Sequence, residues 1–264
     1  MANSLMKKYI TWFNTYVESF INKYPDLSEN IKLKAGHSHK VHSEIIGLAN
    51  ALNLSENEKF IAELIGLFHD VGRFNQFIKY RTFSDSELQN HADLGIEALK
   101  ENSVLKDLKP KEQEIIYKAI YNHSRAEIDE DKNEKVIFFS KMIRDADKLD
   151  IWRLITEYYM VREQKTNKTL ELDLPDSYDV TPDVLNAIVN QKVVLKKSLK
   201  TLSDFKLLQI GWLFDLNFEY SIQRVYDKKY LDKIFDTLPE TDKINQIKEI
   251  VDAYFDKHIK TLPI

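Results

Sequence analysis

The amino-acid sequence predicts a nearly all-α protein. Its 264 residues include only 6 glycines and 6 prolines, the residues that most often interrupt helices. Long segments also place apolar residues three and four positions apart, which is the spacing of a helix with one buried face. These observations together favour a helical bundle over a fold that contains a sheet.

Composition and charge narrow the class of protein. Because there is no cysteine, disulfides, zinc–thiolate sites and thiol catalysis are excluded, and any metal must be bound by nitrogen and oxygen. The net charge of −4 gives no general attraction for long nucleic acid, whereas a small phosphorylated substrate fits. Without a membrane-length apolar run or a signal-peptide pattern, we expect a cytoplasmic protein with no membrane partner. The oligomeric state stays open.

Two helices are expected first. An apolar stripe predicts a packing helix over residues 5–24, and a second stripe predicts a helix that is approached through residues 31–36. On the second helix, His37, Val41 and Ile45 follow one another at intervals of four residues. We therefore place His37 on the core-facing stripe and interpret it as an inward-pointing ligand.

The next helix ends in polar residues that packing does not explain. Ser55 and Glu58 have the spacing of a capping box, and the apolar helix that they begin ends at His69-Asp70. A buried, unpaired carboxylate costs on the order of several kcal/mol, and a cation removes this cost. Residues 74–90 have no sustained period but contain four aromatic residues, so we interpret them as a wall or lid of a site.

Two further helices each present a histidine at one end. Asn90 is the expected cap of a helix that begins with His91. Pro110 is the expected first-turn residue of a helix that ends at about His123. Together with the earlier histidines, these residues form a set that could converge in a helical bundle, where metal sites are built from facing helices.

The longest apolar helix carries another acid. Ile143, Asp147 and Ile151 follow one another at intervals of four residues, which places Asp147 on an apolar face. An isolated carboxylate is costly there, so Asp147 is the acid that we expect to hold a cation. Its neighbours Asp145 and Asp150 are expected nearer the solvent or paired with adjacent cations.

The remaining chain is expected to be a helical extension. The polar segment after the long helix is interpreted as a connector or flap, within which residues 169–174 alternate like a short strand. Thr181 and Pro182 then have the pattern of a helix cap and a first helical residue. We predict three parts: a metal-binding helical core with its N-terminal helix over residues 1–162, a connector over 163–181 and a helical extension over 182–264.

Three local motifs carry a family resemblance. They are His37-Ser38-x-Lys40-Val41, His69-Asp70-Val71-Gly72-Arg73 and Ala146-Asp147-Lys148-Leu149. With the order His, His-Asp, His, His, Asp over residues 31–160, the sequence resembles the HD superfamily of metal-dependent phosphohydrolases. The resemblance implies an HD-domain helical bundle that hydrolyses a phosphoester or phosphoanhydride bond. We expect a small phosphorylated substrate, with nucleotides as the first candidates.

The resemblance also implies roles for individual residues. In this family a minimal ligand set holds one divalent metal, two further histidines bind a second metal, and the aspartate of the His-Asp pair bridges both. The matching residues are His37, His69, Asp70 and Asp147 for the first ion, and His91 and His123 for the second. Such ligands suit Mn, Fe, Co, Ni or Zn better than Mg. Two bound ions polarise phosphoryl oxygens and lower the pKa of a bridging water, which gives Asp70 a catalytic role.

Three cationic side chains are candidates for binding substrate. Arg73 stands where the family often has a lysine that contacts phosphate, and its planar guanidinium favours bidentate phosphate binding. We therefore predict a catalytic and substrate-binding role for Arg73. Arg125 and Lys148 are further candidates for binding phosphate or leaving-group oxygens.

Two other function classes fit the same residues. The six ligands also resemble those of the HD-fold di-iron oxygenases, in which the metals activate dioxygen and a carbon bond is cleaved. Arg73 favours phosphate chemistry over this alternative. The third class is a non-catalytic nucleotide sensor or helical partner-binding protein, and the complete set of ligands argues against it.

Overall fold

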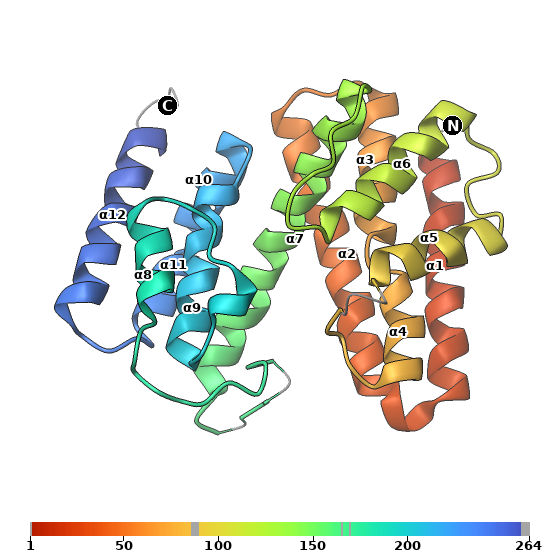
Figure 1. Ribbon diagram of the computed structural model, residues 1–264. Coiled ribbons are helices and arrows are strands. Elements are labelled where there is room, and N and C mark those ends of the chain that lie inside the picture. The colour runs from red at the N-terminus through yellow and green to blue at the C-terminus, as the bar shows by residue number, and fades with distance from the viewer. Residues whose placement is uncertain (1, 86–89, 165, 169, 260–264) are drawn as a thin grey trace. The chain divides into compact units, whose positions relative to one another are not determined.

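The computed structural model describes residues 2–85, 90–164, 166–168 and 170–259. All regular secondary structure in these ranges is helical, as Figure 1 shows, and none of it is strand. The predicted all-α fold is therefore confirmed. No helix in these ranges has both the length and the apolar composition that crossing a membrane requires.

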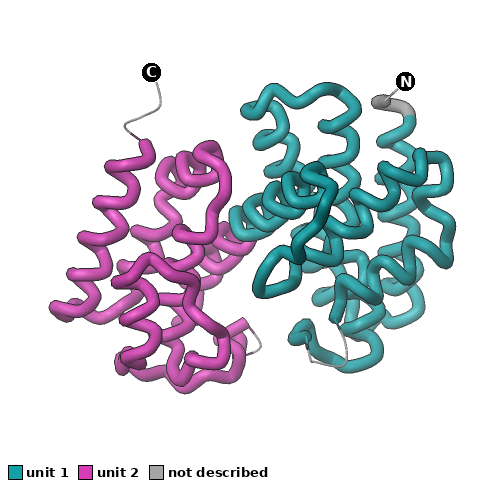
Figure 2. The backbone as a smooth tube through the Cα atoms, turned by 45° about the horizontal axis from the view of Figure 1, so that its top comes forward, with its two compact units in different colours: residues 1–150 teal, residues 151–264 magenta. Residues whose placement is uncertain are grey.

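The chain divides into two compact units, residues 1–150 and residues 151–264 (Figure 2). The border between them falls inside one long helix, α7 (Glu134–Val161). The predicted division into three parts, with borders at residues 162 and 181, stays a prediction. All six predicted metal ligands belong to unit 1.

Unit 1 is a bundle of helices around a buried core. Its helices are α1 (Ala2–Lys23), α2 (Ser28–Ala51), α3 (Glu56–Phe68), α4 (Gly72–Tyr80), α5 (His91–Glu101), α6 (Pro110–His123) and the part of α7 up to residue 150, with a 3-10 turn at Pro25–Leu27. α1 packs against α2 and α3, which pack against each other, while α4 contacts α5 and α6 contacts α3 and α5. Phe13, Leu48 and Phe68 are among the side chains that this packing buries completely.

Local sequence signals explain where these helices begin. The Ser55 hydroxyl accepts the backbone N–H of Glu58, and the Glu58 carboxylate accepts the backbone N–H of Ser55, so the predicted capping box is confirmed. The Asn90 side chain accepts the N–H of Ala92 and caps α5. Pro110 is the first residue of α6, where its missing N–H costs nothing.

Two segments that the sequence treats as irregular are helical. α2 already begins at Ser28, so residues 31–36 lie within it and do not lead to it. α4 covers the first part of the stretch interpreted as a wall or lid. One of its buried positions holds the polar side chain of Gln76, which masks the helical period in so short a segment. Residues 86–89 of that stretch lie outside the described residues.

Unit 2 is helical as well. Beyond the end of α7 it contains α8 (Pro182–Val189), α9 (Leu202–Gly211), α10 (Glu219–Asp227), α11 (Tyr230–Phe235) and α12 (Asp242–Ile259), with 3-10 turns at Lys196–Ser198 and Trp212–Asp215. α9 is the most buried of these helices and contacts α8 and α11, while α12 contacts α8 and α10. Thr181 and Pro182 stand at the start of α8 as predicted.

The strand predicted from the alternation in residues 169–174 is wrong. Within the described part of this segment, residues 170–173 form turns. Leu172 and Asp173 both have a φ of 56°, in the left-handed region that interrupts an extended strand. Residue 169 lies outside the described residues. The alternation of leucines with acids therefore belongs to a turn segment.

Candidate metal centre

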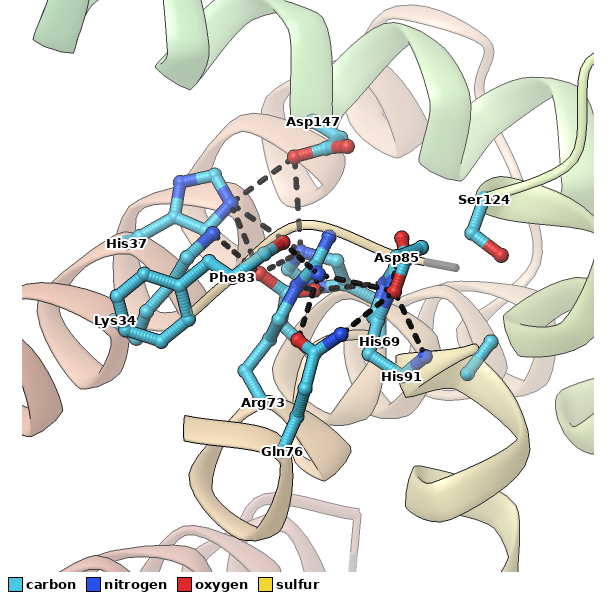
Figure 3. A network of polar contacts seen from close by, with 12 residues as sticks. Lys34, His37, His69, Arg73, Gln76, Phe83, Asp85, His91, Ser124 and Asp147 are labelled. Atoms are coloured by element: carbon cyan, nitrogen blue, oxygen red, sulfur yellow. Dashed lines mark hydrogen bonds and ion pairs between the residues drawn. The ribbon is translucent and has the colours of Figure 1, made fainter. Parts of the chain in front are cut away.

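Six side chains that the sequence predicts as metal ligands lie together in unit 1. His37 comes from α2, Asp147 from α7, His91 from the first residue of α5 and His123 from the last residue of α6. His69-Asp70 opens the turn between α3 and α4. Figure 3 shows how polar contacts join side chains from these separate elements. Five of the six are buried, and the Asp147 side chain is 20% exposed.

Gly72 allows α5 to approach the turn between α3 and α4. A Cβ atom at Gly72 would lie 2.0 Å from the backbone oxygen of His91 and 2.4 Å from the backbone nitrogen of Gly95. Both distances are far inside van der Waals contact, so only glycine permits this approach. As a result, His91 Nε2 lies 3.1 Å from Asp70 Oδ1.

Gly66 likewise allows a close approach between α2 and α3. A Cβ atom there would lie 2.7 Å from Ile45 Cγ2 and 3.1 Å from the Cα atom of His42. Because the two helices pack this closely, His37 from α2 reaches His69 from the end of α3. The Nε2 atoms of these two imidazoles are 3.4 Å apart.

One carboxylate oxygen of Asp70 faces a first group of ligands. Asp70 Oδ2 lies 3.6 Å from His37 Nε2 and 3.8 Å from His69 Nε2. Asp147 Oδ1 lies 3.0 Å from His37 Nε2 and 3.7 Å from His69 Nε2. We call His37, His69, Asp147 and this Asp70 oxygen the first half of the centre.

The other oxygen of Asp70 faces a second group. Asp70 Oδ1 lies 3.1 Å from His91 Nε2 and 3.8 Å from His123 Nε2. The Nε2 atoms of His91 and His123 are themselves 2.9 Å apart. These two imidazoles and Asp70 Oδ1 form the second half, so Asp70 is shared by both halves.

Backbone carbonyls orient one imidazole in each half. His69 Nδ1 lies 2.9 Å from the carbonyl oxygen of Gly66 in the first half. His123 Nδ1 contacts the carbonyl oxygen of Ile120 in the second half. Since a carbonyl oxygen only accepts, the ring proton is on Nδ1 in both cases, and Nε2 of the neutral ring carries a lone pair.

Carboxylates orient the other two imidazoles. His37 Nδ1 lies 2.7 Å from Asp150 Oδ2 in the first half. His91 Nδ1 lies 2.9 Å from both carboxylate oxygens of Asp85 in the second half. These acceptors also place a proton on Nδ1, so the nitrogen that each of the four rings offers to a metal in the centre is Nε2.

This donor set fits divalent metal ions. Facing lone pairs at 2.9 Å, between His91 and His123, and at 3.4 Å, between His37 and His69, repel each other unless a cation or a proton lies between them. Asp147 Oδ1 is buried and accepts no hydrogen bond from the described residues. An acceptor left unpaired beside imidazole nitrogens is the environment that a divalent transition metal satisfies.

Residues 35–152 match the family model of the HD domain. This part of the chain is an HD domain. The matched region contains all six side chains of the centre and the turn between α3 and α4. At the level of the family, an HD domain implies metal-dependent hydrolysis of phosphorylated compounds. Neither a curated protein nor a solved structure matches the chain.

Positive charges keep the shared carboxylate of the HD domain ionised. Burial alone would raise the pKa of Asp70, but the charges of Lys34 and Arg73 beside it help to outweigh burial and hold this pKa well below its usual range. Lys34 Nζ lies 2.9 Å from Asp70 Oδ2, and Arg73 Nε lies 3.3 Å from Asp70 Oδ1. In the opposite sense, burial lowers the pKa of His123 to about 4, so this imidazole is neutral and able to bind metal at neutral pH.

Arg73 of the HD domain is held mainly by protein acceptors. Its Nη1 atom donates to Gln76 Oε1 at 2.9 Å, to the Phe83 carbonyl oxygen at 2.5 Å and to Asp85 Oδ1 at 3.2 Å. Its Nε atom donates to Asp70 Oδ1. The side chain is only 13% exposed. Figure 3 shows this guanidinium among its partners, beside the imidazoles of the centre.

The other two predicted substrate-binding cations have different surroundings. Arg125 pairs with Asp93 of α5 at 3.2 Å, and its guanidinium lies 4.1 Å from the ring centroid of Tyr121. Lys148 follows Asp147 on α7 and is 9% exposed. Their predicted contacts with substrate therefore stay predictions.

Sequence reasoning missed three polar side chains of unit 1 that contact the predicted ligands. Asp145 and Asp150 are 0% and 2% exposed, so the predicted position nearer the solvent is wrong, while the alternative of pairing with adjacent cations stays a prediction. Asp150 is one of the three. Its spacing of three residues from Asp147 was an available signal, because such residues share one side of a helix. Lys34 stands one turn before His37, a signal that required α2 to begin early. Asp85 lies in a non-periodic segment that gave no signal.

Proposed function

We propose that the protein is a two-metal phosphohydrolase that acts on a small phosphorylated compound, with nucleotides as the preferred class. The observation that carries this proposal is the position of Asp70, whose two oxygens face two separate pairs of imidazoles. Both pairs direct Nε2 lone pairs toward the shared carboxylate. The HD family match supports the same class of chemistry.

The two halves of the centre assign the ligands. His37, His69, Asp70 and Asp147 would hold one ion, and Asp70, His91 and His123 would hold the other. We propose Mn, Fe, Co, Ni or Zn, because imidazole and carboxylate ligands suit these metals. When bound, such ions polarise phosphoryl oxygens and activate water for attack on phosphorus.

The chain's own side chains determine where the substrate approaches. Asp147 is the most exposed of the six ligands, at 20% of its side chain, whereas the other five are at most 4% exposed. The centre is therefore most accessible beside Asp147. A phosphate group reaching it from there would meet the first half of the centre.

Lys34 is the cation that we propose for phosphate binding. Its side chain is 21% exposed, and its ammonium group contacts Asp70 Oδ2. An ammonium group has three N–H donors, so it can keep this contact and still bind a phosphate oxygen. Arg73, in contrast, gives its Nε and Nη1 donors to Asp70 and to α4 and the segment after it. We therefore propose that Arg73 mainly stabilises Asp70.

An aromatic ring beside Lys34 supports a nucleotide substrate. The ammonium group of Lys34 lies 5.5 Å from the ring centroid of Phe83. Phe83 is held in place by stacking on Phe77, with centroids 4.5 Å apart and ring planes inclined by 18°. A base stacked on Phe83 would place its phosphates near Lys34.

Phosphate release from a panel of nucleotides and other phosphate esters tests the proposal. Protein loaded with Mn²⁺ or Fe²⁺ is expected to release phosphate equally in air and under anaerobic conditions, and to lose this activity after chelation. The Asp70→Asn variant serves as the inactive control. Product formation that stops without oxygen would instead identify an oxygenase, and binding of nucleotides without turnover would identify a sensor.

A further inference from the structure

We propose that Asp150 and Asp85 are positioning residues, each of which orients one imidazole in one half of the metal centre. This inference rests on the proposed two-metal site. Each half contains one imidazole held by a carboxylate, which is His37 or His91, and one held by a backbone carbonyl. Asp150 would thus support the first half, and Asp85 the second.

Asp150 holds the His37 ring at Nδ1, and the Asp147 carboxylate lies beside the other nitrogen, Nε2. Asp150 Oδ2 lies 2.7 Å from His37 Nδ1, and Asp147 Oδ1 lies 3.0 Å from His37 Nε2. Both acids come from α7, one turn apart, so the contact with Asp150 directs Nε2 of the ring toward Asp147. The Asp150 side chain is only 1% exposed, which leaves little room for water to replace it.

Asp85 is itself fixed by several donors. Both of its oxygens lie 2.9 Å from His91 Nδ1, and Oδ1 also accepts the His91 backbone N–H at 3.1 Å. Gln76 Nε2 and Arg73 Nη1 donate to the same oxygen at 2.9 Å and 3.2 Å. Figure 3 shows Asp85 among Arg73, Gln76 and His91. The aspartate thereby ties α4 to the first residue of α5.

The negative charge of Asp150 and Asp85 should make their effect on metal binding larger than that of the backbone carbonyls. A carboxylate on Nδ1 fixes the tautomer and makes Nε2 a stronger ligand, whereas a carbonyl mainly orients the ring. Loss of such a partner typically weakens metal binding about 10- to 100-fold. Because the Asp85 side chain is 30% exposed, water can partly replace it. Its loss should therefore lie at the lower end of that range.

Cobalt titration of the full chain tests this inference. His37→Ala and His91→Ala first identify which binding step belongs to which half. Asp150→Asn, which removes the charge at nearly constant size, is expected to weaken the first-half step about 10- to 100-fold and leave the second unchanged. Asp85→Asn is expected to show the reverse pattern. An equal loss at both halves, or no loss at either, would overturn the proposal.

Asp204→Asn is a matched control for the removal of a buried carboxylate. Asp204 is 0% exposed and belongs to unit 2, where it accepts the N–H and the hydroxyl of Thr181. This variant is expected to lower the melting temperature without changing either cobalt affinity. If it weakened cobalt binding as much as the two test variants, their effects would be losses of stability, and the positioning role would be wrong.

Nitrogen NMR of the metal-free wild-type protein reports the tautomer of each imidazole, and this test does not depend on the folding of a variant. His37 and His91 are expected to carry their ring proton on Nδ1, and the opposite tautomer would overturn the inference.

The outcomes of these experiments also separate this inference from the proposed function. Two cobalt ions and the crossed variant pattern without phosphate release would leave the positioning roles intact and remove the hydrolase assignment. A wild-type protein that binds fewer than two ions would remove both.

Discussion

His37 and Asp150 are joined by a 2.7 Å contact between Nδ1 and Oδ2, although 113 residues separate them in the chain. The contact links α2 to α7 within unit 1. It also directs the other nitrogen of His37 toward Asp147 and Asp70. A ring fixed in this way is prepared for metal binding before any ion arrives, which lowers the entropic cost of assembling the site.

Substitution of Gly72 tests whether close helix packing builds the second half of the centre. Gly72→Ala places a methyl group 2.0 Å from the His91 oxygen, so α5 must move. We expect a loss of about 3 kcal/mol or more in the free energy of unfolding and weaker binding at His91. Urea unfolding and cobalt titration measure the two effects.

Gly36→Ala is the control for that substitution. Gly36 also lies in a helix, but no described atom beyond its own helix turn lies within 4 Å of its Cβ position. Alanine there should stabilise the protein by about 0.5–1 kcal/mol, because it restricts the unfolded chain. If both variants behaved alike, the packing argument for Gly72 would be wrong.

Removal of the Lys34 charge tests its proposed contact with phosphate. Lys34→Met is expected to raise KM about 10- to 100-fold, as for the loss of a hydrogen bond to a charged group, with a smaller change in kcat. Lys40→Met, on an exposed position of the same helix, should leave KM unchanged. Steady-state kinetics with the best substrate of the panel measure KM for both variants. An unchanged KM in Lys34→Met would assign phosphate binding to another cation.

A buried lysine in unit 2 predicts a pH-dependent stability. Burial lowers the pKa of Lys206 to about 8, and its ammonium group donates to the Thr237 carbonyl oxygen at 2.8 Å. Between pH 8 and about 10.5, the unfolded chain therefore binds more protons than the folded chain at this group. Its contribution to the free energy of unfolding should rise with pH in that window and stay constant below it.

Urea unfolding between pH 7 and 10 of the wild type and of Lys206→Met measures this contribution. The variant is expected to lack the rise, whereas a variant of the exposed Lys228, Lys228→Met, should keep it. The same slope in Lys206→Met and wild type would show that Lys206 titrates normally.

The fold class follows from helical periodicity, and the six candidate ligands follow from polar residues on apolar stripes or at the ends of helices. His69-Asp70 interrupts an apolar helix, and His91 follows a cap, so each stands out from its neighbours. The partners that orient them do not stand out. Asp150 lies among apolar residues on α7, and four-residue spacing assigned Asp147 alone to the buried face. In the structure His37 lies between the two acids, and Asp150 is the more buried of the two.

Contacts between distant segments explain the remaining differences. α4 has nine residues, too few for a clear period, and it places a charged Arg73 and a polar Gln76 in protected positions. Several hydrogen bonds of these side chains are made with Asp85 and the segment around Phe83. Such a polar network depends on the folded position of two segments, and neither segment alone indicates it.

The number of metal ions bound per chain tests the central claim most directly. Equilibrium dialysis against Co²⁺, followed by elemental analysis, is expected to give two ions for the wild type, one for His91→Ala and none for Asp70→Ala, with helical circular dichroism retained in all three. A single ion in the wild type, or equal loss of both ions in His91→Ala, would contradict a centre in which Asp70 is shared by two halves.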